Sequence, residues 1–210
     1  MYTLVACPGT GSAIAEAALS LAGLPFTIRE ADPWNAEEDR AFLRSLNPLG
    51  QLPVLVLPDG TVMTESAAIV LHAAEETPAS RLAPAPGSPA RAGFLRWLEY
   101  LVASIYPTFT FGDEPGRWVP GDEAAAALRR RTDEYRQFLW QVMEAGIGPG
   151  PWVLGADFSA LDIYVSVMTR WRPRRDWFKE VCPRLHGIAA AVDRMPSLAP
   201  VWARNFSQAG

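Results

Sequence analysis

The chain is poor in cysteine and histidine and contains no long apolar run. Its only cysteines, Cys7 and Cys182, lie far apart in dissimilar contexts, which argues against a disulfide framework. The two histidines, His72 and His186, also lie far apart in the sequence, so the sequence predicts no metal site. No uninterrupted apolar stretch approaches the roughly 18 residues that a membrane helix needs. We therefore expect a protein that uses neither a metal nor a membrane anchor.

An excess of basic residues is also missing. The chain has 19 Lys and Arg against 23 Asp and Glu, and its formal net charge is −4. Nucleic acids and anionic membranes attract basic surfaces, so neither is expected as a partner. Residues 1–6 are short of the length of a secretory signal and carry no basic residue, which makes the cytoplasm the expected location.

Turn residues and hydrophobic periodicity predict an α/β domain over residues 1–77, with the order β-α-β-α-β-β-α. Gly23 ends the first helix, and Pro58-Asp59-Gly60 is a strong hairpin signal between the last two strands. The predicted strands are 2–6, 26–30, 54–57 and 61–63, and the predicted helices are 13–22 (after an N-cap at Ser12), 37–46 and 64–76.

The composition changes after this domain. Four prolines within residues 78–89 predict a linker, and residues 90–210 predict only helices. Ser159 and Asp162 have the spacing of a helix capping box. Apolar residues at helical spacing predict four buried faces: Phe94, Trp97, Leu98, Leu101 and Ile105; Leu128, Tyr135, Phe138, Leu139 and Val142; Leu161, Tyr164, Val165 and Met168; Leu185, Ile188 and Val192.

Three short patterns in the first domain suit ligand binding. The Leu52–Pro53 bond, after Gln51, is of the one common type that adopts the cis form, which would turn the Leu52 N–H and C=O toward a ligand that pairs like an extra strand. An ordinary trans proline at a strand start is the alternative. Glu65 and Ser66 open a helix, where a carboxylate is favoured, and Glu65 can pair with an ammonium group. A simple helix cap is the alternative there.

The third pattern is the loop Cys7-Pro8-Gly9-Thr10-Gly11-Ser12, between the first strand and the first helix. N–H groups converge at a helix start, so a thiolate would be stabilised at this point. Ser12 is also suited to cap the helix, and a serine-capped loop is the alternative.

Together these patterns resemble the glutathione transferase family. The resemblance rests on residues 47–55 (NPLGQLPVL), on residues 64–69 (TESAAI), and on residues 157–164 (DFSALDIY), which resemble the family's capping motif. It implies a thioredoxin-like N-terminal domain followed by an all-helical domain. It also implies that Leu52 and cis-Pro53 hold the cysteinyl backbone of glutathione, that Glu65 and Ser66 hold its γ-glutamyl end, and that the chain is a cytoplasmic homodimer active in detoxification.

The chain departs from the bacterial beta-type pattern Pro-Gly-Ala-Cys-Ser, because Gly11 stands where that pattern has its cysteine. Candidates for thiol activation are the hydroxyls of Thr10 and Ser12, which could donate to the glutathione sulfur, and Cys7, which could form a mixed disulfide; backbone N–H groups alone are a further possibility. Leu49 replaces a basic residue that many relatives use for the glycine end of glutathione, and the Gln51 amide could take over that contact.

The resemblance places an apolar electrophile between the domains, against residues 100–118. Tyr106, Phe109, Phe111 and Trp118 are the candidate substrate residues, because an aromatic wall suits flat apolar compounds. Residues 171–177 could close the same site through Trp171, Arg172, Arg174, Arg175 and Trp177. An interdomain core is the alternative for this aromatic cluster.

The expected function is transfer of glutathione to an apolar electrophile, with glutathione as co-substrate and no metal. One alternative is a glutathione-dependent reductase of disulfides or peroxides on the same scaffold, which Cys7 would serve. The other is a non-catalytic interaction module that keeps the fold. The intact set of Leu52, Pro53, Glu65 and Ser66 speaks against that module, and the missing cysteine speaks for it.

Overall fold

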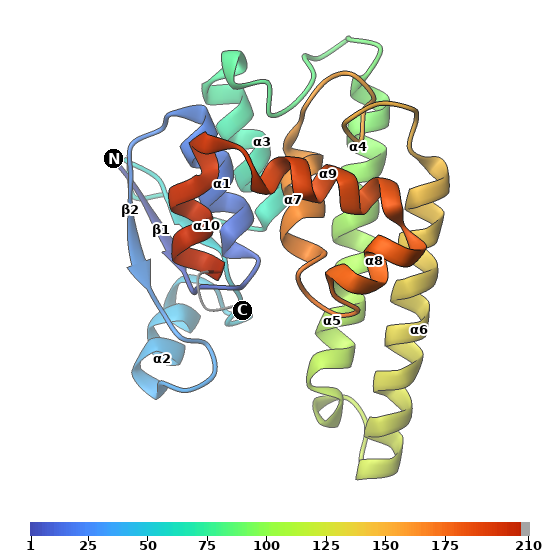
Figure 1. The fold of residues 1–210 in the computed structure, drawn as a ribbon. Coiled ribbons are helices and arrows are strands. Elements are labelled where there is room, and N and C mark those ends of the chain that lie inside the picture. Colours follow the sequence, from blue (N-terminus) through green and yellow to red (C-terminus); the bar gives the residue numbers. More distant parts are fainter. Residues whose placement is uncertain (207–210) are drawn as a thin grey trace. The chain divides into compact units, whose positions relative to one another are not determined.

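A computed structural model describes residues 1–206 of the chain (Figure 1). The chain divides into two compact units. The first contains Met1–Ala85 together with the described residues from Ala191 onward, and the second is Pro86–Ala190. The change between units falls inside the predicted linker, which contains the short 3₁₀ helix η1 (Pro78–Ser80) and the fully buried Leu82. The domain boundaries at residues 77 and 90 stay a prediction, because the C-terminal segment returns to the first unit.

The first unit has the predicted order of strands and helices, and its thioredoxin-like arrangement is confirmed. Its four-stranded sheet has the order β2-β1-β3-β4, with β1 and β2 parallel and the other pairs antiparallel. The strands are β1 (Tyr2–Ala6), β2 (Phe26–Glu30), β3 (Val54–Val56) and β4 (Val62–Thr64). The helices are α1 (Ser12–Ala22), α2 (Glu37–Leu46) and α3 (Ser66–Glu76).

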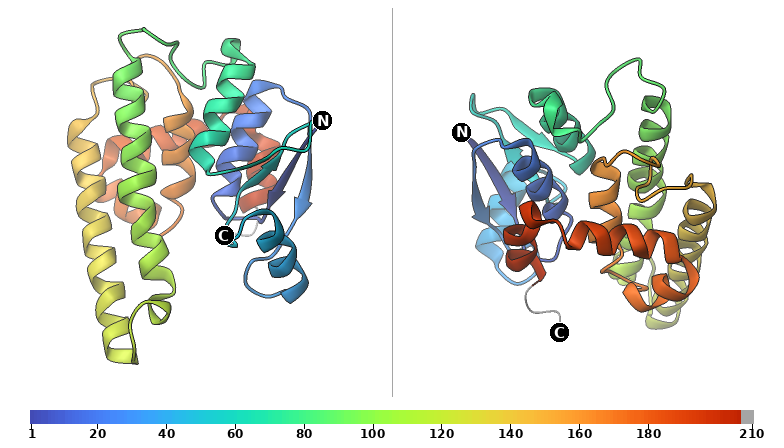
Figure 2. Two further views of the ribbon diagram at one scale, coloured as in Figure 1. Left: turned by 180° about the vertical axis from the view of Figure 1, so that it is seen from behind. Right: turned by 45° about the horizontal axis from the view of Figure 1, so that its top comes forward.

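Helices cover both faces of this sheet (Figures 1 and 2). Val5 and Val54 are paired in the register and form a core with Leu43 of α2. Leu4 and Leu55, the next pair, are equally buried and point to the opposite face, because successive strand residues alternate. Helices α1 and α3 pack against each other and cover that second face.

The second unit is helical, as predicted. Its first helix runs from α4 through the π-helical segment η2 into α5, and a short 3₁₀ turn, η3 (Pro115–Arg117), precedes the long α6. No helix within residues 1–206 is both long and apolar enough to cross a membrane. The remaining bounds are α4 (Arg91–Glu99), η2 (Tyr100–Ile105), α5 (Tyr106–Asp113), α6 (Asp122–Gly146), α7 (Ala160–Met168), α8 (Arg175–Val181) and α9 (Pro183–Asp193).

Three of the four predicted apolar faces are buried, and the prediction for α6 is wrong. Tyr135 and Phe138 are 53% and 57% exposed, whereas Arg136 is buried beside Leu139 and Trp140. The buried stripe of α6 is therefore rotated from the predicted one. Arg136 can occupy it because its guanidinium group finds partners on α5, which the sequence pattern of α6 alone does not show.

The predicted capping box of α7 is present and fully buried. Ser159 is the N-cap, and the Asp162 carboxylate accepts hydrogen bonds from the N–H groups of Ser159 and Val153, each at 2.8 Å. Burial raises the pKa of Asp162 to about 7, although the two N–H donors favour its charged form. This box ties the start of α7 to the loop that precedes it.

The C-terminal segment completes the first unit. After α9, a 3₁₀ turn η4 (Pro196–Leu198) leads into α10 (Ala199–Phe206), and both contact α1. Figures 1 and 2 show α10 lying beside α1. The last described helix thus packs against the first helix of the chain.

Candidate functional site

The pairing register brings the three predicted ligand-binding segments to one edge of the sheet. Val54 pairs with Val5 on one side and with Thr64 on the other. One residue further on, the Cys7–Ser12 loop leaves the end of β1, Leu52-Pro53 enters β3, and Glu65-Ser66 leaves β4. Three segments that are not contiguous in the sequence therefore occupy neighbouring strand ends, which is the arrangement that one extended ligand would need.

Two hydroxyl groups of the Cys7–Ser12 loop are bonded to each other. Thr10 Oγ1 and Ser12 Oγ lie 2.8 Å apart, and each lies within hydrogen-bond distance of the Cys7 carbonyl, at 2.8 and 3.0 Å. Ser12 Oγ also accepts from the Cys7 N–H at 3.2 Å. The prediction that Ser12 caps α1 is wrong: Gly11 is the N-cap and Ser12 is the first helical residue. The Ser12 hydroxyl instead closes the loop.

Proton counting and burial distinguish these two hydroxyls. The two hydroxyl groups make three contacts but have only two protons between them. One hydroxyl can therefore donate its proton elsewhere while the other still bonds the Cys7 carbonyl or the neighbouring hydroxyl. Ser12 has no exposed surface, whereas Thr10 is partly exposed. Of the two residues, Thr10 is therefore the one that is accessible from solvent.

The environment of Cys7 disfavours its thiolate. Burial raises the pKa of the Cys7 thiol, and the nearby carboxylates of Asp32 and Glu30 raise it further, against a smaller opposing effect of Arg204. Tyr2, the other early hydroxyl, is buried, and its OH lies 3.1 Å from His72 Nε2. Tyr2 is therefore part of the buried core.

The segment that enters β3 presents an open main chain. The Leu52–Pro53 peptide is cis, and Leu52 makes no main-chain hydrogen bond to any residue within 1–206. The sequence did not point to Asn47, although its buried side chain donates to the Gln51 carbonyl at 2.9 Å and accepts from the Leu49 N–H at 3.1 Å. Leu49 itself is 69% exposed.

Glu65 has an unusual backbone conformation. Its φ is +67°, in the left-handed region that side chains rarely adopt, and it occupies the N-cap of α3 directly before Ser66. Strain of this kind persists where the surroundings fix it and is frequent at ligand sites. No acidic residue lies in the first turn of α3, so a ligand carboxylate would meet the helix N-terminus without repulsion from within that turn.

In the second unit, the predicted substrate residues form two separate pairs. Tyr106 and Phe109 both contact Trp171 edge to face, with ring centroids 5.7 and 5.2 Å apart. Phe111 and Trp118 contact each other at 4.8 Å and are 40% and 48% exposed. Tyr106 and Phe109 thus share Trp171 as a neighbour, whereas Phe111 and Trp118 contact each other.

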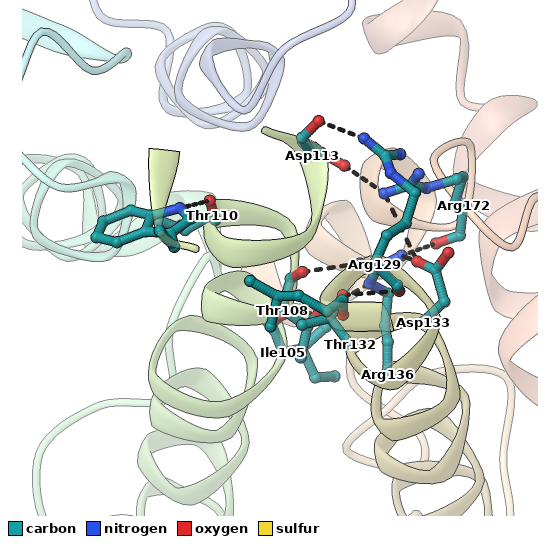
Figure 3. A network of polar contacts seen from close by, with 11 residues as sticks. Ile105, Thr108, Thr110, Asp113, Arg129, Thr132, Asp133, Arg136 and Arg172 are labelled. Atoms are coloured by element: carbon teal, nitrogen blue, oxygen red, sulfur yellow. Dashed lines mark hydrogen bonds and ion pairs between the residues drawn. The ribbon is translucent and has the colours of Figure 1, made fainter. Parts of the chain in front are cut away.

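A buried arginine, whose polar contacts Figure 3 shows, lies against one ring of the first pair. The Arg136 guanidinium lies 3.8 Å from the Phe109 ring centroid, on a ring that also contacts Trp171. It donates to Thr108 Oγ1 at 2.8 Å, to the Thr108 carbonyl at 2.9 Å and to Asp133 at 2.8 Å. Arg136 thus connects α6 to α5 beneath the aromatic residues, a role that the sequence did not indicate.

The approach of α5 to α6 depends on a glycine. A Cβ atom at Gly112 would collide with the Thr132 side chain and would lie 3.4 Å from the Arg136 guanidinium. At the end of α5, the Asp113 carboxylate accepts from Arg172 at 2.5 Å and the Asp113 carbonyl accepts from Arg129 (Figure 3). These contacts fix the segment that carries Phe109.

The side chains of residues 171–177 have partners on several elements. Trp171 packs on Phe109 and Tyr106, as described, and Arg172 pairs with Asp113. Arg175 donates to the Ser166 carbonyl at 2.8 Å, and Trp177 packs edge to face on Phe178 at 5.1 Å. Arg174, with φ +78°, forms the turn that starts α8.

Comparisons with known proteins agree with this geometry. Residues 12–76 match the family model described as glutathione S-transferase, N-terminal domain. The GST-like protein YncG of Escherichia coli K12, whose own description is uncharacterized, is 37% identical over 98% of both chains. Glutathione S-transferase GstA of Escherichia coli O157:H7 is 27% identical over 78% of this chain and 79% of its own.

Solved structures extend the likeness to the whole fold. A glutathione transferase homolog from Sulfitobacter, crystallised with bound glutathione, superposes with a TM-score of 0.85 at 27% identity and covers 96% of both chains. The identity to YncG spans both units, so it does not rest on the N-terminal domain alone. The chain belongs to the glutathione S-transferase family.

Proposed function

We propose that this protein binds glutathione at the sheet edge of the first unit, activates its thiol and conjugates it to an apolar electrophile. The observation that carries the proposal is the register of β1, β3 and β4, which gathers the Cys7–Ser12 loop, Leu52-Pro53 and Glu65-Ser66 at adjoining strand ends. Each segment offers a different kind of contact, and together they match the chemistry of a short peptide with free termini.

Each part of glutathione has a proposed partner. Leu52 N–H and C=O pair with the cysteinyl backbone like an added strand, since no other described residue bonds them. Glu65 pairs with the γ-glutamyl ammonium group, and the Ser66 hydroxyl and the N–H groups at the N-terminus of α3 donate to the adjacent carboxylate. The Gln51 amide contacts the glycine end, where Leu49 offers no charge.

Thr10 is the proposed donor to the glutathione sulfur. Its partly exposed hydroxyl, held beside the start of α1, stabilises the thiolate after the thiol proton passes to solvent. The thiolate then attacks an electrophilic carbon, a C–S bond forms, and in a substitution the leaving group departs with the bonding electron pair. Ser12 shapes the loop, and Cys7 stays a neutral thiol.

Thr10→Val is expected to raise the pKa of bound glutathione by about one unit and to lower kcat/KM about tenfold, because one hydrogen bond to the thiolate is lost. The measurement is the ultraviolet thiolate band of glutathione with the protein, titrated against pH, followed by turnover of a chromogenic electrophile. In the unchanged protein the bound thiol should ionise well below the free value of about 8.5.

Thr10→Ser is the matched control, because it keeps the hydroxyl and should keep the low thiol pKa. A Thr10→Val protein with an unchanged thiol pKa would remove Thr10 from this role. Absence of the thiolate band from the unchanged protein would contradict conjugation altogether. Cys7→Ser should leave turnover intact, whereas its inactivation would favour the glutathione-dependent reductase.

The acceptor site is proposed to involve Tyr106 and Phe109, supported by Trp171, with the exposed Phe111 and Trp118 as a second aromatic patch. Flat apolar electrophiles suit such rings. A role in detoxification in the cytoplasm follows from that substrate class and from the family, and fractionation of cells that produce the protein tests the location.

A homodimer is expected, with a solution mass twice the chain mass of 23.0 kDa. Two aromatic side chains of α6, Tyr135 and Phe138, support this proposal because they stack at 6.3 Å and are more than half exposed. Light scattering after gel filtration measures the mass, and Phe138→Asp should lower it to that of one chain. A single-chain mass for the unchanged protein would contradict the dimer.

A further inference from the structure

A buried ion pair anchors the last described helix to the first. Arg204 of α10 meets the Glu16 carboxylate of α1 with Nε 3.0 Å from both oxygens and Nη2 2.5 Å from Oε2. The Glu16 side chain is only 6% exposed and that of Arg204 22% exposed. Nη1 of Arg204 also lies 3.0 Å from Glu30 at the end of β2. One guanidinium group therefore holds α10 to both α1 and the sheet.

Asn205 adds a second attachment to the same carboxylate. Its Nδ2 donates to Glu16 Oε2 at 2.8 Å and to the Val201 carbonyl at 2.9 Å, and the residue is 6% exposed. Glu16 lies four residues after Ser12 and so occupies the same face of α1, one turn further along. The contacts on Glu16 therefore fix the first turns of α1, from which the thiol loop emerges.

The main chain of Asn205 also reaches the loop directly. A Cβ atom built on Gly9 would lie 3.8 Å from the Asn205 carbonyl oxygen, and Gly9 has a φ of +77°. The loop therefore passes against the end of α10 one residue before Thr10. The charge of Arg204 is close enough to lower the pKa of the Cys7 thiol, against the stronger effects of burial and of Asp32 and Glu30.

We infer that Arg204 and Asn205 are positioning residues of the glutathione site, which hold the Cys7–Ser12 loop and the start of α1 in the arrangement that activates the thiol. The inference rests on the proposed function for its chemical part. Neither residue needs to touch glutathione, because each acts through Glu16 or through Gly9. The C-terminal helix is then a component of the thiol-activating machinery.

The test compares Arg204→Gln with Arg194→Gln, an exposed position of the same unit. Arg204→Gln should raise the pKa of bound glutathione by about one unit, since the loop donor is displaced, and should speed hydrogen exchange of residues 7–14 about tenfold or more. Arg194→Gln should change neither. If the Arg204→Gln protein does not fold, because Glu16 is left buried without its counter-charge, the double variant Glu16→Gln with Arg204→Gln, which removes both charges, replaces it in the test.

The two readouts separate the possible failures. A lower melting temperature with unchanged thiol pKa and unchanged exchange of residues 7–14 would make α10 a purely structural element and would overturn the inference. A missing thiolate band in the unchanged protein would refute the proposed function, and hydrogen exchange would then still test whether Arg204 holds the loop. Recovery of the thiol pKa in Arg204→Lys would support positioning by charge.

Discussion

Replacing Glu65 and Ser66 together by alanine is expected to weaken glutathione binding at least about 100-fold, because hydrogen bonds to charged groups contribute about 1.5–3 kcal/mol each. The double variant removes the proposed partner of the ammonium group and one donor to the carboxylate. Residue 65 retains a side chain at φ +67°, so the strain of the backbone persists in the variant. Isothermal titration with glutathione measures the loss.

The control removes a negative charge at the opposite end of the same helix. Glu75 is exposed at the far end of α3, and Glu75→Gln, which removes one negative charge as Glu65→Ala does, should bind glutathione as the unchanged protein does. Circular dichroism and the melting temperature of both variants establish that the fold is intact. Unchanged affinity in the Glu65/Ser66 variant would refute the assignment of this binding segment.

Arg136→Ala is expected to lower the free energy of unfolding by about 3–5 kcal/mol, the usual range for removing one partner from a buried ionic network. The change empties the space between α5 and α6 and leaves the Thr108 hydroxyl without its donor. It also removes the cation that lies against the Phe109 ring. Urea denaturation followed by tryptophan fluorescence measures the difference in stability.

Arg131→Ala is the matched control, since the Arg131 side chain is 82% exposed on the same helix and pairs only with the exposed Glu134 among the described residues. Its effect should stay below about 1 kcal/mol. Arg136→Met separates volume from charge, because it fills the space without hydrogen bonds and should lie between the two. Equal stabilities of the Arg136→Ala and Arg131→Ala variants would show that the network contributes little.

The first unit was predictable because its signals are local. Gly23 ends α1, the Pro58-Asp59-Gly60 turn fixes the β3–β4 hairpin, and strand ends follow directly from these boundaries. Neighbouring strand ends then bring the ligand-binding segments together without any information on distant side chains. The hydrogen bonds of the Cys7–Ser12 loop are different, because whether the Thr10 or the Ser12 hydroxyl is buried depends on the exact path of six residues.

The errors lie where the contacts are distant in sequence. The sequence spacing of Tyr135 and Phe138 fits an apolar stripe on α6. In the structure α6 instead buries Arg136, whose partners Thr108 and Phe109 lie about 28 residues away. In the same way, nothing around Arg204 indicates that its partner is Glu16, 188 residues earlier. A charged residue in a helix looks exposed until its counter-charge is located.

The return of α10 to the first unit also has a consequence for how the protein is made. Residues 86–190 must be translated before α10, which packs against α1, can leave the ribosome. At about 5–20 residues per second, the earlier part of the first unit waits on the order of 5–20 s for Arg204, the partner of Glu16. The Cys7–Ser12 loop therefore meets α10 only after Ala199–Phe206 has been made, so a chain truncated before Arg204 is expected to lack this support for the proposed glutathione site.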